Sequence, residues 1–183
     1  MVSTIEFSND PAFKKNSIIE NWVGDYPAIF KSNKTFRFML STHDVSCTFV
    51  YNGLAFKTVQ HALQYMKYSL QNDTAAKLFS LTSNAGLAKR SARRAYRIGS
   101  RLSMTAEQKK KWDAMQDILV AEITNEKYAQ NAHAPIAHIL CATQNAELYF
   151  IDQNNEKKVR AHYLEQIRDR LQIVRNVVES CLA

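Results

Sequence analysis

Residues 52–71, NGLAFKTVQHALQYMKYSLQ, decide the part of the fold that this sequence predicts most clearly. Asn52 and Gly53 form the pair most favoured for a tight β-hairpin, because both residue types tolerate a positive φ. Thr58 then offers a hydroxyl oxygen that accepts a hydrogen bond from a free amide in the first turn of a helix. The stretch therefore predicts a hairpin followed directly by a helix.

The predicted helix carries an apolar stripe with a polar stripe beside it. The apolar stripe has the three-and-four spacing of a buried helix face and consists of Val59, Ala62, Leu63, Met66 and Leu70. The polar stripe lies within roughly 60° of arc on the adjacent face and consists of Gln60, Gln64, Lys67 and Gln71. Side chains that border a buried stripe tend to line the rim of a cleft, so we expect the polar stripe to face a ligand pocket.

The remaining chain reads as further helices with a few strands. We expect strands at 35–40 and 146–151, a loop at 152–158, and helices at 17–23, 74–81, 85–98, from near Trp112 toward Tyr128, at 135–143, and at the C-terminus. The predicted fold class is α+β, mainly α with a small β-hairpin or sheet. We expect one domain over 36–183, with residues 1–35 as an N-terminal extension packed on it.

The C-terminal helix has a regular three-four alternation of apolar residues. Its members are Leu164, Ile167, Leu171, Val174, Val178 and Cys181. This alternation is typical of a helix that packs on the core of its own domain. A dimer seam has the same pattern and stays open as an alternative.

Composition excludes several functional classes. The chain has 183 residues, of which 46% are hydrophobic and 22% charged, as in ordinary soluble proteins. No apolar run is long enough to span a bilayer, and the start lacks the pattern of a secretory signal, so we expect a cytoplasmic protein without membrane contact. Cys47, Cys141 and Cys181 lie far apart, and no His or Glu spacing suggests ligands. We therefore expect no disulfide, no metal and no cofactor.

Positive charge is concentrated between Lys89 and Lys111. This segment has nine basic residues against one acidic residue, Glu107, whereas the whole chain has a formal charge of +7. The rest of the chain is thus nearly neutral. The segment predicts a local anionic partner, either a phosphate or a nucleic-acid backbone. A solvated basic helix face is the alternative.

Several motifs, in this order, resemble the NADAR family, to which the YbiA type of N-glycosidase belongs. The resemblance spans about residues 36 to 175. The family's first helix reads Ser/Thr-x-Glu-His-x-x-Gln-x-x-Lys, which Thr58, His61, Gln64 and Lys67 match. Two later elements, Lys-Phe-x-Gln-Asn and Leu-Leu-x-Thr-Gly-x-Ala-x-Leu, are matched by Lys127, Tyr128, Gln130, Asn131, Ile139, Leu140, Thr143, Ala146 and Leu148.

The resemblance implies a protein that cleaves or binds the N-glycosidic bond between a ribose and a base, in a ribosyl or ADP-ribosyl nucleotide. Such a bond breaks through an oxocarbenium-like state, which requires help for the leaving base and a nucleophile or negative charge near C1′. The catalytic residues expected from this chemistry are Lys67, Gln60 and Asn155. The expected ligand-binding residues are His61, Gln64, Arg93, Trp112 and Lys127. For Lys67 a simple surface amine, and for Trp112 a core aromatic, remain the alternatives.

Two departures from the family pattern affect the predicted chemistry. Gln60 stands where the family has a Glu, and Asn155 stands where it has an Asp, in a loop without the family's Gly and Trp. An amide keeps the shape and reach of a carboxylate but removes its charge and its proton transfer. Two hypotheses follow: an N-glycosidase or ADP-ribosyl hydrolase in which Lys67 performs the covalent step, and a catalytically silent module that binds ADP-ribose or nucleic acid.

Overall fold

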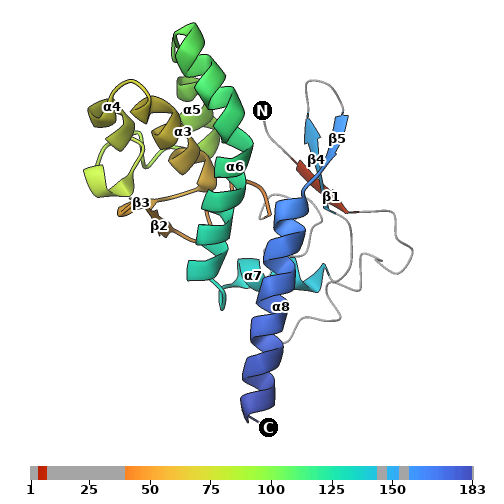
Figure 1. The fold of residues 1–183 in the computed structure, drawn as a ribbon. Coiled ribbons are helices and arrows are strands. Elements are labelled where there is room, and N and C mark those ends of the chain that lie inside the picture. The colour runs from red at the N-terminus through yellow and green to blue at the C-terminus, as the bar shows by residue number, and fades with distance from the viewer. Residues whose placement is uncertain (1–3, 8–39, 144–147, 153–156, 183) are drawn as a thin grey trace. The chain divides into compact units, whose positions relative to one another are not determined.

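The computed structural model describes residues 4–7, 40–143, 148–152 and 157–182. These residues are mainly helical with two small antiparallel sheets, which confirms the α+β class (Figure 1). The chain divides into two compact units. The first contains Met1–Val2 and Thr42–Gln130, and the second contains Ser3–Ser41 and Asn131–Ala183. The single domain expected over 36–183 is therefore divided after Gln130.

The first unit begins with the predicted hairpin. Strands β2 (Phe49–Tyr51) and β3 (Leu54–Phe56) pair antiparallel. The turn residues Asn52 and Gly53 have φ values of 50° and 73°. The positive φ at both positions is what this pair tolerates, so the hairpin prediction is confirmed.

Side chains occupy both outer edges of this two-stranded sheet. The Gln130 amide accepts from the Val50 N–H and donates to the Val50 carbonyl, both at 2.7 Å. On the other edge, the Ala55 N–H donates to the Thr82 hydroxyl at 3.0 Å, and the Ser80 hydroxyl donates to the Ala55 carbonyl at 3.0 Å. Exposed strand edges invite pairing with other chains, so these bonds protect the hairpin.

Helix α3 (Val59–Ser69) follows the hairpin as predicted. The Thr58 hydroxyl oxygen accepts from the His61 N–H at 3.2 Å, which confirms the cap. The apolar face of α3 packs against the hairpin and the next long helix. The buried core of this unit consists of Phe49, Tyr51, Phe56, Val59, Ala62, Leu63, Trp112, Leu119 and Ile123.

Two predicted helices are shorter than expected. The helix predicted at 74–81 is α4 (Asp73–Lys77), followed by a 3₁₀ turn at Leu81–Ser83. The helix predicted at 85–98 is α5 (Ala92–Gly99), which begins where the Ser91 hydroxyl accepts from the Arg94 N–H at 3.3 Å. Serine bonds well to a free amide at a helix start, and this cap sets the boundary.

The long helix α6 (Ala106–Gln130) begins six residues before Trp112. The Thr105 hydroxyl accepts from the Gln108 N–H at 3.2 Å, and the Gln108 side chain accepts from the Thr105 N–H at 2.9 Å. These two bonds form a capping box, whose Thr-x-x-Gln signature is legible in the sequence. The prediction of a start near Trp112 was wrong because it followed only the apolar line.

The second unit holds a three-stranded antiparallel sheet in the order β1-β4-β5. Its strands are β1 (Thr4–Phe7), β4 (Leu148–Asp152) and β5 (Lys157–Arg160). The loop predicted at 152–158 is therefore wrong at both ends, since Asp152 pairs with Lys157. The strand predicted at 35–40, apart from Leu40, and the helix predicted at 17–23 lie outside the described residues.

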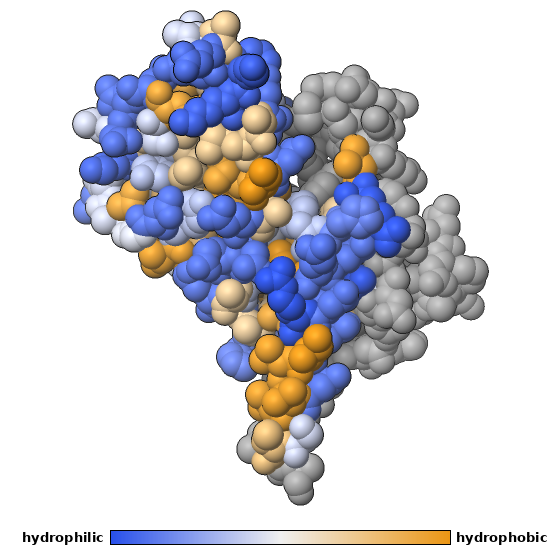
Figure 2. Space-filling model, viewed as in Figure 1, coloured by the Kyte–Doolittle hydropathy of each residue, from blue (hydrophilic) through white to orange (hydrophobic). Residues whose placement is uncertain are grey.

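Two helices complete this unit. Helix α7 (Pro135–Ala142) has Pro135 at its first position, as predicted. In helix α8 (His162–Leu182), Leu164, Ile167 and Leu171 are buried, which confirms packing onto the chain's own core over the first half. Val174 and Val178, farther along, remain 52% and 46% exposed (Figure 2). No helix among the described residues is long and apolar enough to cross a membrane.

Candidate functional site

The polar stripe of α3 faces the end of α5 and the start of α6. The Lys67 ammonium donates to the Gly99 carbonyl at 3.0 Å. One turn farther along, the Gln71 amide donates to the Ser103 carbonyl and, at 3.1 Å, to the Gln108 side chain. The neighbouring Tyr68 hydroxyl donates to the Ile98 carbonyl at 3.3 Å. The C-terminal turn of a helix leaves carbonyls unpaired, and α3 supplies donors to them.

Lys67 and Trp112 lie together, as the resemblance to the family implies. The Lys67 Nζ is 5.8 Å from the centroid of the Trp112 ring, within the range of a cation–π interaction. Trp112 is buried and belongs to the core cluster, whereas Lys67 is half-buried. The candidate ligand-binding aromatic and the candidate nucleophile are therefore adjacent.

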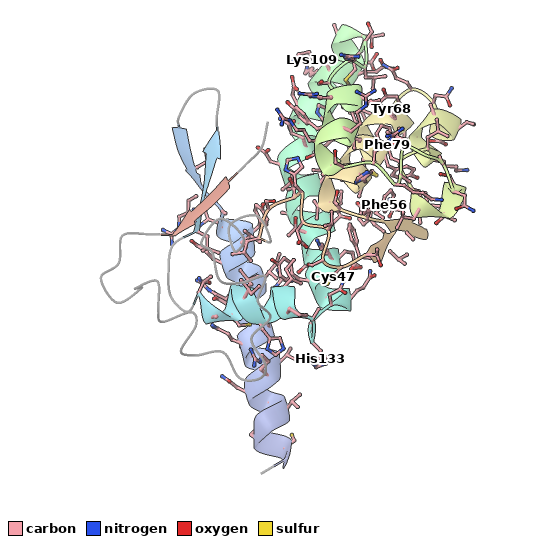
Figure 3. The ribbon with its side chains drawn as sticks, turned by 180° about the vertical axis from the view of Figure 1, so that it is seen from behind. Cys47, Phe56, Tyr68, Phe79, Lys109 and His133 are labelled. Carbon is pink, nitrogen blue, oxygen red and sulfur yellow. The ribbon has the colours of Figure 1, made fainter. Side chains whose placement is uncertain are left out.

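The environment of Lys67 changes its proton affinity. Burial lowers the pKa of Lys67 below its ordinary value. The carboxylate of Asp113 raises the pKa and the ammonium of Lys109 lowers it, each by less than burial does. Figure 3 labels Lys109 at the outer end of α6 and Tyr68 on the neighbouring α3. The net effect is an amine that loses its proton more readily than a free lysine, which nucleophilic catalysis by lysine requires.

Gln64 packs tightly against Gly99. Its Oε1 is buried and has no hydrogen-bond partner among the described residues. A Cβ added at Gly99 would lie 1.5 Å from this oxygen and 2.4 Å from the carbon that bears it. Gly99 is therefore the residue that lets α5 approach the polar stripe of α3 this closely.

We expect Gly99→Ala to lower the free energy of unfolding by about 1–3 kcal/mol, because the added methyl overpacks the contact with Gln64. The loss should appear although alanine favours a helix over glycine. Gly86→Ala is the matched control, since a Cβ there meets nothing within 4 Å. Urea unfolding measures both variants. If Gly99→Ala is as stable as Gly86→Ala, or if Gln64→Ala does not rescue it, the close contact is not what requires glycine.

Gln60 and His61 belong to a different region from Lys67. Seven residues separate Gln60 from Lys67, which places them about 10 Å apart along the helix axis. The Gln60 N–H donates to the Thr42 carbonyl at 2.9 Å, and the Thr42 hydroxyl reaches the Gln60 side-chain oxygen at 3.5 Å. His61 is fully buried, with Nδ1 2.8 Å from the Thr58 hydroxyl. Burial, together with the nearby Lys57, lowers the pKa of His61 to about 4.

Lys127 forms a buried ion pair that the sequence analysis did not predict. Its Nζ lies 2.7 Å from the Asp44 carboxylate and donates to the Asp44 carbonyl at 3.1 Å, and both side chains are 2% exposed. The Ser46 hydroxyl donates to the same carboxylate at 2.6 Å. A signal for this pair was present, since Lys127 continues the buried line of Leu119 and Ile123 at a spacing of four. A lysine on such a line requires a buried acceptor.

The two remaining predicted site residues lie elsewhere. Arg93 is exposed on α5, whereas the buried face of α5 consists of Ala92, Ala95 and Gly99. The structure therefore does not place Arg93 on the face that meets Lys67. Asn155 lies outside the described residues.

Comparison with known proteins finds no family model, curated protein or solved structure that matches this chain. The relation to the NADAR family therefore depends on the order of the motifs and on the chemistry of the site.

Proposed function

We propose that this chain acts on, or binds, a ribosyl or ADP-ribosyl nucleotide at its N-glycosidic bond, as NADAR proteins do. The observation that carries the proposal is the position of the Lys67 amine, 5.8 Å from the Trp112 ring centroid. An amine with a lowered pKa beside an indole offers a nucleophile and an aromatic surface in one place. The proposed site belongs entirely to the first unit, on α3, α5 and α6.

In the enzymatic form of this proposal, the neutral Lys67 amine attacks C1′ of the ribose. The base leaves with the electron pair of the N-glycosidic bond, and a proton reaches the base from solvent or from a polar neighbour. Ring opening of the ribosyl-lysine then gives an imine, which water hydrolyses to the free sugar and the amine. A carboxylate at position 60 is not needed for the covalent step, since the loss of one acid or base typically costs about 10²–10⁴-fold in rate.

The second candidate is a catalytically silent module that binds the same ligand. Two observations favour it. The Gln60 side chain is buried and cannot ionise, and the Lys67 ammonium already donates to the Gly99 carbonyl. Replacing a carboxylate by an amide also removes repulsion toward an anionic ligand. Binding without turnover would result.

Release of free base from an ADP-ribosylated guanine nucleotide distinguishes the two. If the chain is an enzyme, we expect Lys67→Ala to reduce base release at least tenfold, because the nucleophile is gone. Gln60→Ala should release base at close to the native rate. Borohydride should also attach the sugar to Lys67 by reducing the imine, which intact-protein mass spectrometry detects.

Lys77→Ala serves as the control, because Lys77 is an exposed lysine of the same unit. Binding of the nucleotide without base release, weakened by Lys67→Ala and not by Lys77→Ala, supports the silent module. Neither binding nor release by the native protein would contradict both candidates.

A further inference from the structure

The exposed face of α5 is made of arginines. At 100° per residue, Arg93, Arg94 and Arg97 span an arc of about 100°, on the side of α5 opposite its buried face. All three are exposed. The small residues Ala92 and Ala95 are buried on the other side.

These arginines belong to a larger basic surface formed by α5, its flanking loops and the start of α6. The basic surface consists of Lys89, Arg90, Arg93, Arg94, Arg97, Arg101, Lys109, Lys110 and Lys111, all of them exposed. Within the part of the chain that the structure describes, Lys109 alone among these nine forms an ion pair, with Asp113. The cations on α5 therefore face solvent with their charge uncompensated.

This arrangement is unfavourable for the isolated helix. Like charges four residues apart repel each other, and Arg93 and Arg97 are such a pair. Arg93 and Arg94 also lie in the first turn, where the helix dipole disfavours cations. An ordinary solvated helix face interleaves acidic residues with basic ones, but no acidic residue occurs from Lys89 to Arg101. A local rule broken at this cost, without compensation inside the described chain, points to a partner that supplies the negative charge.

The nature of the surface selects the kind of partner. A protein interface needs apolar or aromatic anchors. None of the exposed large hydrophobic residues among the described positions lies between Lys89 and Lys111. A single phosphate group reaches only one or two guanidinium groups on a convex helix. A chain of phosphates contacts many cations at once and releases a counterion at each.

We infer that the basic surface of α5 and the start of α6 binds the phosphate backbone of a nucleic acid. The arginines bind phosphate oxygens through paired N–H donors and carry no sequence preference themselves. This inference does not depend on the proposed function, because Arg93, Arg94 and Arg97 point away from the α5 face that carries Gly99.

Salt dependence of binding tests the inference. Fluorescence anisotropy with labelled DNA of about 20 nucleotides, single-stranded and duplex, is measured between about 50 and 200 mM NaCl. The variant Arg93→Gln/Arg97→Gln should lower the slope of log K against log salt by about 1.8 on duplex DNA, at about 0.9 per phosphate lost. Its affinity near 0.1 M salt should then fall about 50-fold.

A charge-matched control separates a local surface from net charge alone. Lys77→Gln/Arg170→Gln removes two exposed cations elsewhere and should leave the slope unchanged. Thermal unfolding should show the arginine variant to be at least as stable as the native chain, because repulsion is relieved. Equal effects of the two variants, no DNA binding at low salt, or equal displacement of DNA by inorganic phosphate or polyglutamate would each overturn the inference.

Discussion

Replacing Lys127 by methionine is expected to lower the free energy of unfolding by about 3–5 kcal/mol. The variant leaves the Asp44 carboxylate buried without its cation, and only the donors of Ser46 remain on it. An uncompensated charge in a water-free interior costs far more than a broken surface pair. Urea unfolding followed by circular dichroism measures the loss, and amide hydrogen exchange of α6 localises it.

A double variant tests whether charge, rather than packing, is the cause. Asp44→Asn/Lys127→Met removes both charges and should be more stable than Lys127→Met alone. Lys77→Met, at an exposed lysine, should change the stability little. Equal losses in the single and double variants would show that the ion pair itself contributes nothing.

Acidification from pH 6.5 to 4 is expected to destabilise the protein by about 3 kcal/mol for each of two buried histidines. Burial lowers the pKa of His43 to about 4, and burial and Lys57 lower that of His61 to about 4. Above pH 6.5 both histidines are neutral in the folded and unfolded states, so their contribution is constant. As the pH falls below 6.5, the unfolded chain binds protons that the folded chain refuses, and stability is lost until the pH reaches about 4.

The comparison of unfolding at pH 7 and pH 5 isolates this effect from the change of side chain. His61→Gln should remove about half of the difference between the two pH values, even if it destabilises the protein at both. His133→Gln, at an exposed histidine, should leave the difference unchanged. An unaltered difference in His61→Gln would show that His61 is not one of the titrating groups.

Local signals predicted the elements that short-range chemistry controls. The Asn52-Gly53 turn, the Thr58 cap and the start of α7 at Pro135 were all predicted, because each depends on the backbone preferences of one or two residues. The capping box of Thr105 and Gln108 was equally local, and it was missed only because the apolar line was followed instead. The caps at Asn72 and Ser91 shortened two further predicted helices in the same way.

Part of the candidate site was also predictable. The periodicity of α3 placed Gln64 and Lys67 on one face, and the resemblance placed Trp112 with them. The structure shows Lys67 and Trp112 to be adjacent. It also shows that Gln60, on the same face, belongs to another polar region beside Thr42.

The sequence by itself determined where the chain turns, where most helices begin and which faces are apolar, because those features depend on neighbours a few residues apart. Only the tertiary structure decided which polar groups meet. The Asp44 carboxylate and the Lys127 amine are 83 residues apart, and the Lys67 amine and the Gly99 carbonyl are 32 apart. Such pairs form when packing of the apolar faces brings distant segments together, and burial then makes each polar group depend on the partner it finds.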